Sequence, residues 1–507
     1  MDNVLAYDIG GSAFKGGLVS PEGKICAISV MNQKPPVTDQ RGCSEKDPRE
    51  WWDDFLSLTG RLLERPEAKT GKIIGLVISG VTRTQVFLDK DANSIRPALT
   101  WADGRANKQV GQVLAIQGDT GILGKTFGPV NAYHPLPRLL WLKENEPDQF
   151  ERIRLVLEPK DYLNFCLTGV AAGDRISLSR LLTVADEMPC RELFLSLGLS
   201  PDIMPPIMEP QTYLGAVREG LEPPLNKLSG VPVFVGSIDA WCGSLGIGTV
   251  EAGRAYNVSG TSEVFGVVTN EAEEVHGLVT LPWGRGLYQI GGPSQAGADC
   301  LTWLLEVFGN KKTLLAPEAA LKELGKSKRQ PEPILFLPYL RGERTPLWEP
   351  DARGLFLGIS RRHGRSDFIW SVLEGIAFAN RQVLELASGH TSLAVQEIRI
   401  TGGASLSNLW CQTKADVLNL PVVRTHASEA GLLGAAMVAL VGLKIYSDLD
   451  EVQKRFVRID RAFEPRKDRT GIYDHLYSRW LETQEALLPL SCALTRDVRA
   501  GVTMSAE

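Results

Sequence analysis

The sequence predicts a mixed α/β protein built from two related domains with a cleft between them. Its 507 residues exceed what one compact core usually accommodates, since single domains span about 100–250 residues. Short apolar runs typical of buried strands, such as residues 73–79 and 231–236, alternate with segments of helical spacing, such as residues 139–142. A hairpin pattern from the start of the chain also returns roughly 250 residues later, which suggests an internal duplication.

The repeated hairpin sets the expected domain organisation. Residues 4–19 form an apolar run, a glycine pair and a second apolar run, and residues 255–268 repeat this order with a turn of small residues. We therefore expect an N-terminal domain over residues 1–247 and a C-terminal domain over residues 248–485. Residues 486–507 turn polar and small, and we expect them to form a tail.

The composition excludes several classes of partner. Sixty acidic and 55 basic residues give a formal charge of −5, which provides no general attraction for nucleic acid or an anionic membrane. No apolar run approaches the roughly 18–20 residues of a membrane-spanning helix, and the first residues do not resemble a leader peptide. The eight cysteines form no CxxC pair, so we expect reduced thiols and a cytoplasmic protein that acts on a small molecule.

Two turns rich in small residues are candidate phosphate sites. Each lies between the strands of one predicted hairpin, where several backbone N–H groups can point at one anion. Either turn alone also fits an ordinary hairpin, but the presence of both favours a binding site for a triphosphate. The residues are Gly10, Gly11, Ser12 and the nearby Lys15 in the first turn, and Gly260, Thr261 and Ser262 in the second.

Two carboxylates are candidates for chemistry. Asp8 ends the first strand, where it could orient water on a Mg²⁺ ion that bridges phosphates, or could merely form an Asx turn. Asp239 follows a strand and begins a run of small residues, so it would lie near a helix N-terminus as an ionised general base or as a helix cap. Spacing alone favours the cap.

Further along, the chain resembles the FGGY carbohydrate kinases. Residues 133–145 look like the first signature of that family, with Arg138 in place of its usual Lys, and residues 354–374 match the second. Three shorter segments agree, namely residues 160–163, 338–346 and 401–404. The resemblance implies two actin/hexokinase-like (ribonuclease H-like) domains with an interdomain cleft, the N-terminal one binding most of the sugar and the C-terminal one most of the nucleotide. It also implies ATP and Mg²⁺ as cofactors, and a homodimer.

The resemblance also implies roles for individual residues. Asp239 corresponds to the catalytic base of the family and would contact the substrate. Asp8, together with the first turn, corresponds to the part of the family's site that binds the metal ion and the phosphates. Residues 101–105 are similar to the sugar-binding W-x-D-x-R segment, although a salt-bridged surface turn is the alternative. The implied sugar residues are Trp101, Asp103 and Arg105, and the implied adenosine residues are Gly402, Gly403, Ser405 and Asn408.

The substrate itself is left open by residues 78–85. Xylulokinases and many gluconokinases have a Met-His pair there and glycerol kinases have Gln-Arg-Glu-Thr, whereas this chain places Thr82 and Arg83 in the substrate-facing slot. An Arg suits a carboxylate or a hydroxyl-rich ligand equally. We predict a sugar kinase for a ketopentose of the xylulose type. The alternatives are a kinase for a sugar acid or polyol, such as gluconate, erythritol or glycerol, and a catalytically silent sensing relative.

Overall fold

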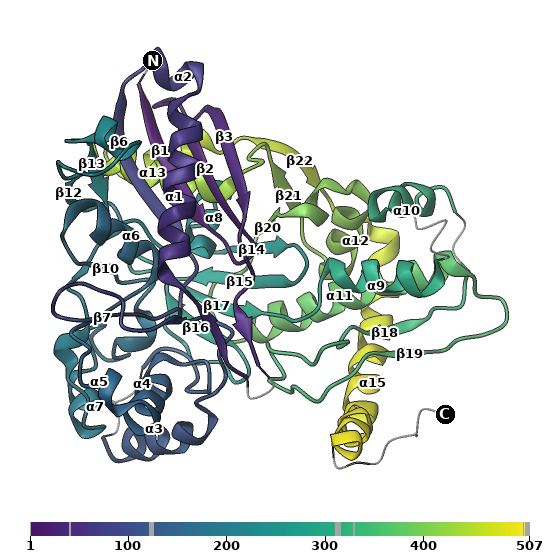
Figure 1. The fold of residues 1–507 in the computed structure, drawn as a ribbon. Coiled ribbons are helices and arrows are strands. Elements are labelled where there is room, and N and C mark those ends of the chain that lie inside the picture. Colours follow the sequence, from purple (N-terminus) through teal and green to yellow (C-terminus); the bar gives the residue numbers. More distant parts are fainter. Residues whose placement is uncertain are drawn as a thin grey trace. The chain divides into compact units, whose positions relative to one another are not determined.

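The computed structural model describes residues 2–39, 42–120, 126–309, 316–327, 330–499 and 501. The chain divides into two compact units. Unit 1 comprises residues 1–250, 281–286 and 429–458, and unit 2 comprises residues 251–280, 287–428 and 459–507. The predicted α/β class with two domains is confirmed, since each unit contains a mixed sheet covered by helices (Figure 1).

The sheet of unit 1 is built around the first hairpin. Strand β1 pairs antiparallel with β2 and parallel with β6, which pairs parallel with β13. The strand order across the sheet is β12 (Tyr213–Ala216), β13 (Pro232–Phe234), β6 (Ile73–Gly80), β1 (Asn3–Ile9), β2 (Ala13–Val19) and β3 (Ile25–Asn32).

The sheet of unit 2 repeats this topology. Strand β14 pairs antiparallel with β15 and parallel with β20, which pairs parallel with β21. The order is β16 (Val279–Pro282), β17 (Tyr288–Pro293), β15 (Glu263–Thr269), β14 (Arg254–Ser259), β20 (Glu397–Thr401), β21 (Val422–Thr425) and β22 (Ile459–Phe463). The matching pairings of β1 and β14 agree with the duplication that the sequence predicts.

Helices cover both faces of the unit 1 sheet. On one face, Leu5 and Tyr7 pack with Phe55 of helix α1, which begins at Pro48 behind the N-cap Asp47. On the other face lies α13, whose Leu432 approaches Gly17 of β2. The longer helices of unit 1 are α1 (Pro48–Leu63), α3 (Asn107–Thr120), α4 (Pro135–Asn145), α6 (Pro159–Thr168), α8 (Asp239–Ile247), α13 (Ala430–Gly442) and α14 (Leu449–Phe456). The unit also contains the short helices α2 (Pro66–Lys69), α5 (Pro147–Phe150) and α7 (Arg191–Ser196).

Two glycines allow the backbones of α8 and α13 to come into direct contact. A Cβ atom on Gly246 would lie 2.0 Å from the carbonyl oxygen of Ala430, and one on Gly434 would lie 1.8 Å from that of Cys242. Only a residue without a side chain fits at either position. This packing ties residues 429–458 to unit 1, whereas the sequence prediction placed them in the C-terminal domain.

The helices of unit 2 include a long one at the C-terminus. They are α9 (Ala298–Phe308), α10 (Pro317–Leu324), α11 (Arg365–Ser388), α12 (Asn408–Leu418) and α15 (Lys467–Arg499), with a small hairpin of β18 (Leu335–Leu337) and β19 (Leu355–Leu357). Helix α15 continues through the predicted tail to Arg499, and Cys492 within it is buried. Residues 500 and 502–507 of that tail lie outside the described residues.

Candidate active site

Asp8 is half-buried near the end of β1, one residue beyond Tyr7 and therefore on the opposite face of the sheet. Its Oδ1 accepts a hydrogen bond of 3.2 Å from the Ser79 hydroxyl on β6. Burial and the negative charge of Asp239 raise the pKa of Asp8 to about 7, while the positive charge of Lys15 acts in the opposite direction. Asp8 and Asp239, which are far apart in sequence, thus lie within charge-interaction distance.

The first glycine-rich turn connects β1 to β2. The Gly10 N–H donates to the Ala13 carbonyl over 3.0 Å, and the Gln33 side chain donates to the Gly10 carbonyl over 2.6 Å. Gly11 and Ser12 at the tip are exposed. Lys15, which we predicted as a phosphate ligand, pairs with Glu429 over 2.6 Å. That carboxylate directly precedes α13, and its nearness is not visible from the order of the sequence.

Asp239 is the first residue of α8, and Ile238 is its N-cap. The chain reaches this point through Gly236, whose φ of 72° suits glycine and whose Cβ, if present, would lie 2.0 Å from the Ile78 carbonyl oxygen. Asp239 Oδ1 accepts the Ala240 N–H over 2.6 Å. Burial raises the pKa of Asp239, and the Ala240 N–H and the charge of Arg83 oppose that rise.

The segment of Thr82 and Arg83 is clamped by two buried side chains. Glu158 accepts the Arg83 N–H over 2.9 Å and the Thr84 N–H over 3.2 Å, and its Oε1 lies 3.2 Å from the Thr82 hydroxyl. Arg138 donates to the Arg83 carbonyl over 2.6 Å. The clamp holds Arg83 at a φ of 56°, a left-handed conformation that costs a residue with a side chain about 1 kcal/mol or more.

Buried cations gather behind this segment. The Arg138 guanidinium also donates twice to the Asp103 carbonyl, over 3.1 and 2.8 Å, and Arg180 donates to the Phe127 carbonyl over 3.1 Å. Burial and the charge of Arg83 lower the pKa of Arg180 to about 9. Burial raises the pKa of Glu158 to about 8, and the backbone N–H groups of Thr84 and Arg83 oppose that rise.

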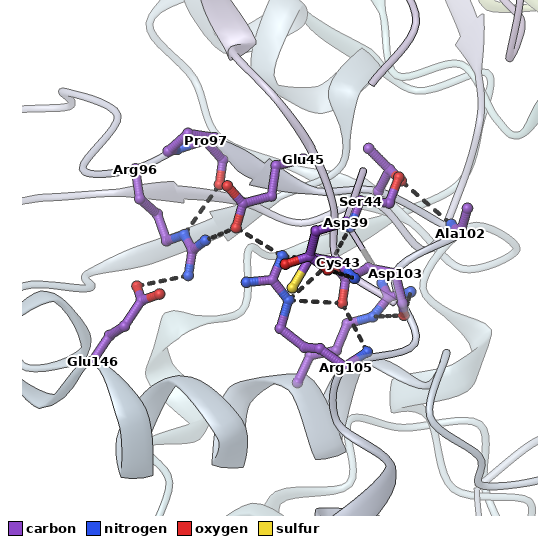
Figure 2. Close-up of polar contacts among 12 residues, drawn as sticks. Asp39, Cys43, Ser44, Glu45, Arg96, Pro97, Ala102, Asp103, Arg105 and Glu146 are labelled. Atoms are coloured by element: carbon purple, nitrogen blue, oxygen red, sulfur yellow. Dashed lines mark hydrogen bonds and ion pairs between the residues drawn. The ribbon is translucent and has the colours of Figure 1, made fainter. Parts of the chain in front are cut away.

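Asp103 and Arg105 form a buried ion pair (Figure 2). Asp103 accepts the Ser44 N–H over 2.7 Å and the Arg105 Nη2 over 2.7 Å, and its side chain is fully buried. Arg105 reaches Glu45 over 2.7 Å, and Glu45 also pairs with Arg96. The turn is salt-bridged as in our alternative, but the ion pair itself is buried rather than at the surface, and both side chains are committed to partners inside the protein.

Trp101 differs from this pair. Its side chain lies beside the first turn, since a Cβ on Gly11 would be 3.8 Å from the indole nitrogen. With 38% of its surface exposed, Trp101 presents an aromatic face that a ligand can reach.

The second turn, Gly260–Ser262, connects β14 to β15 in unit 2. The Gly260 N–H donates to the Ser262 carbonyl over 3.1 Å, and the Ala298 N–H at the start of α9 donates to the Gly260 carbonyl over 2.9 Å. Thr261 at the tip is exposed. Gly297 packs so tightly that a Cβ there would lie 2.5 Å from the Thr261 carbonyl oxygen.

The predicted adenosine segment adjoins this turn. Gly402 has a φ of 90°, and a Cβ there would lie 2.4 Å from the Ser259 carbonyl oxygen. Gly403 and Asn408 are exposed, and the side-chain Oδ1 of Asn408 accepts a hydrogen bond from Arg424 over 3.1 Å. Ser405 is buried and donates to the Gly402 carbonyl over 2.6 Å, so its hydroxyl shapes the loop.

Each unit therefore brings together one group of predicted residues. In unit 1, Asp8, Asp239, Arg83 and the first turn share one region, and in unit 2 the second turn meets the 402–408 loop. Sequence reasoning missed Glu158, although it lies two residues before the 160–163 segment that we had noted. Within the described ranges, no cluster of three or more His, Cys, Asp or Glu side chains could by itself hold a metal ion.

No helix in the described part of the chain is long and apolar enough to cross a membrane.

Comparison with known proteins identifies the class of protein. The chain is 29% identical to a xylulose kinase of Staphylococcus epidermidis over 504 residues, which cover 98% of both proteins. Its structure resembles a gluconate kinase and a xylulose kinase from Lactobacillus acidophilus with TM-scores of 0.88 and 0.87. Both are 24% identical and cover 96% of this chain and 98% of their own. The fold is that of a two-domain sugar kinase.

Matches to models of protein families identify the family within this class. Residues 3–246 match the N-terminal domain and residues 255–443 the C-terminal domain of the FGGY family of carbohydrate kinases. The chain belongs to this family, which confirms the resemblance, and it is a sugar kinase that uses ATP.

Proposed function

We propose that this chain transfers the γ-phosphoryl group of ATP to a hydroxyl of a ketopentose of the xylulose type. The substrate proposal rests on relatives that are xylulose kinases and align over nearly the whole chain. The fold does not choose among sugars, since a gluconate kinase and a xylulose kinase resemble it almost equally.

The observation that carries the proposal is the environment of Asp239. One carboxylate oxygen is held by the backbone of its own helix over 2.6 Å, which orients the group. Burial raises its pKa and makes it a stronger base than an exposed Asp, while the positive charge of Arg83 opposes that rise. These properties are what a general base for an alcohol substrate needs.

In the proposed reaction, Asp239 takes the proton of the acceptor hydroxyl as its oxygen attacks the γ-phosphorus. The bond from that phosphorus to the bridging oxygen breaks and ADP leaves. Because the transition state is loose, positioning and charge stabilisation provide most of the acceleration. The turns Gly10–Ser12 and Gly260–Ser262 are the proposed phosphate donors, and the 402–408 loop is the proposed adenosine site.

Mg²⁺ is the metal that we propose for Asp8. A single half-buried carboxylate suits this ion, which keeps several waters and takes its other ligands from phosphates. The ion would supply charge neutralisation at the β- and γ-phosphates. Asp8 would hold its hydration shell, and Ser79 fixes the carboxylate for that purpose.

For the sugar, we propose that Trp101 packs against the carbon skeleton and that Thr82 and Arg83 contact the substrate directly. Asp103 and Arg105 are proposed to support that surface through the buried network described above. Arg138 would join both parts, because it donates to the carbonyls of Asp103 and Arg83.

A second candidate is a sugar acid. The charge of Arg83 acts on both Arg138 and Arg180, and no hydrogen bond in the described residues joins any of the three guanidinium groups to a carboxylate. Unpaired buried cations are costly, and a substrate carboxylate near Arg83 would compensate them.

An ADP-release assay with MgATP tests both candidates. We expect a xylulose-type ketopentose to exceed gluconate, ketohexoses, erythritol and glycerol by at least about tenfold in kcat/KM. Gluconate ahead of the ketopentose, with Arg83→Gln reducing gluconate turnover selectively, would favour the second candidate. ADP release independent of any acceptor would contradict both.

A cytoplasmic location and a homodimer remain proposals. All eight cysteines are free, which suits a reducing compartment. Helix α15 exposes Leu490, Leu494 and Val498 at helical spacing, with 60%, 61% and 56% of their surfaces accessible. Sedimentation velocity measures the oligomeric state directly, and a monomer at micromolar concentration would contradict the dimer.

A further inference from the structure

A fully buried ion pair lies beneath the second turn of unit 2. The Lys414 ammonium group on α12 donates to Glu263 Oε2 over 2.7 Å. It also donates to the side-chain oxygens of Asn257 over 2.6 Å and Asn380 over 2.7 Å. Lys414 and Glu263 are each 1% exposed, so all three donors of the lysine are used inside the protein.

The same network fixes both ends of the turn. Glu263 is the first residue of β15, immediately after Ser262, and its other oxygen accepts the Ser259 hydroxyl over 2.5 Å. The Asn257 amide on β14 donates to Glu263 Oε2 over 2.5 Å. The carboxylate therefore bridges the strand that enters the turn and the strand that leaves it.

The network also joins the turn to the adenosine segment. Lys414 is on α12, the helix that begins at Asn408 directly after the 402–408 loop. Gly402 of that loop packs against the Ser259 backbone. A shift of the lysine or of its carboxylate partner would therefore change the turn and its relation to the loop together.

Stability alone does not account for this pair. Desolvation of two buried charges offsets much of their attraction, and well-packed apolar replacements are often as stable. What the pair provides is a fixed geometry, because a lysine with three oxygen acceptors has one arrangement that satisfies all of them.

We propose that Lys414 and Glu263 are a positioning pair that holds the Gly260–Ser262 turn in the shape that binds the ATP phosphates. The proposal rests on the phosphate-binding role of this turn under the proposed function. Lys414 itself is buried and does not touch the nucleotide.

The test compares binding of MgATP and AMP to the full-length protein by calorimetry, together with KM for each substrate. For Lys414→Met we expect MgATP affinity to fall at least tenfold, while AMP affinity and the KM for the sugar stay within about twofold. Lys414→Arg is expected to restore part of the loss. If Lys414→Met does not fold, the double variant Lys414→Met/Glu263→Gln, which leaves no unpaired charge, replaces it with the same expected results.

Arg466→Met is the matched control. It removes the partner of the buried Asp416 on the same helix, where the two side chains meet at 2.5 Å away from the turn. We expect lower stability with unchanged MgATP affinity. The proposal is overturned if folded Lys414→Met binds MgATP as the wild type does, if AMP affinity falls equally, or if Arg466→Met weakens MgATP binding to the same extent. A wild-type protein that does not bind MgATP would instead contradict the proposed function.

Discussion

The carboxylate of Asp8 lies against the backbone of Gly431, so close that a Cβ atom on Gly431 would come within 2.5 Å of Asp8 Oδ2. Gly431 is the second residue of α13, and Glu429, which pairs with Lys15, directly precedes that helix. The start of α13 therefore determines where two of the predicted site residues point.

Gly431→Ala should displace the Asp8 carboxylate. Because a misplacement of about 1 Å at a reacting centre can cost about 10²-fold, we expect kcat to fall at least tenfold while the protein stays folded. Gly471→Ala is the control, since a Cβ there meets nothing within 4 Å. Steady-state kinetics with both variants checks this, and an unchanged kcat in Gly431→Ala would contradict the role of Asp8.

Asp8 should make stability depend on pH in the absence of ligands. Its pKa is raised from 3.8 to about 7 in the folded protein by burial and by Asp239, with Lys15 and Ser79 opposing and Glu429 adding a smaller rise. Between these values the native state binds more protons than the unfolded state. The stabilising contribution is therefore complete below pH 3.8 and is lost as pH rises through 7, with a slope of up to about 1.4 kcal/mol per pH unit.

Denaturant unfolding of wild type and Asp8→Asn from pH 5 to pH 8 measures this slope. The variant should gain stability relative to wild type as the pH rises. Asp53→Asn, which removes an exposed carboxylate of α1, should leave the wild-type slope intact. Parallel pH profiles for wild type and Asp8→Asn would rule out the raised pKa.

Asp103 and Trp101 should separate structural support from substrate contact. Asp103→Asn removes one of the two carboxylates that pair with the buried Arg105 side chain, and we expect a loss of about 3 kcal/mol in the free energy of unfolding. Trp101→Ala removes a partly exposed side chain, and we expect less than about 1 kcal/mol and a sugar KM raised about tenfold. Chemical denaturation and steady-state kinetics of both variants measure these effects. A stability loss confined to Trp101→Ala would contradict the assignment of Asp103 to structural support and of Trp101 to substrate contact.

The C-terminal helix should be required for stability beyond residue 485. Ser491 bonds to the backbone of Arg353 over 3.0 Å, and Arg496 contacts Asp351 and Glu349 over 3.0 and 3.1 Å. A chain ending at residue 485 should melt at least about 4 °C lower than the full chain, whereas one ending at residue 501 should melt as the full chain does. Equal melting temperatures for all three would show that residues 486–499 behave as the tail that the sequence suggests.

The two hairpins and strands β6 and β13 could be predicted because their signals are local. Apolar runs broken by small residues mark β1, β2, β14 and β15, and their ranges fall within a few residues of those expected. The membership of α13 in unit 1 could not be predicted, because it depends on backbone contacts with α8 that a chain order does not reveal.

Site residues divide in the same way. Strand ends and small residues made Asp239 and the two turns candidates, but spacing alone favours a helix cap for Asp239, and their roles stay predictions. The sequence does not reveal which groups pair with four other predicted residues, because packing decides each pairing. These residues are Lys15, Asp103, Arg105 and Ser405. Glu429 illustrates this, since it lies 414 positions from Lys15 and only the fold brings the two together.

The proposed role of Asp239 is tested most directly by steady-state turnover of Asp239→Asn with MgATP and its best sugar. The account predicts that kcat falls about 10²–10⁴-fold while the dissociation constants for MgATP and for the sugar change little, because the amide keeps the shape of the site but cannot accept the proton. A variant that turns over within a few-fold of wild type would contradict Asp239 as the general base.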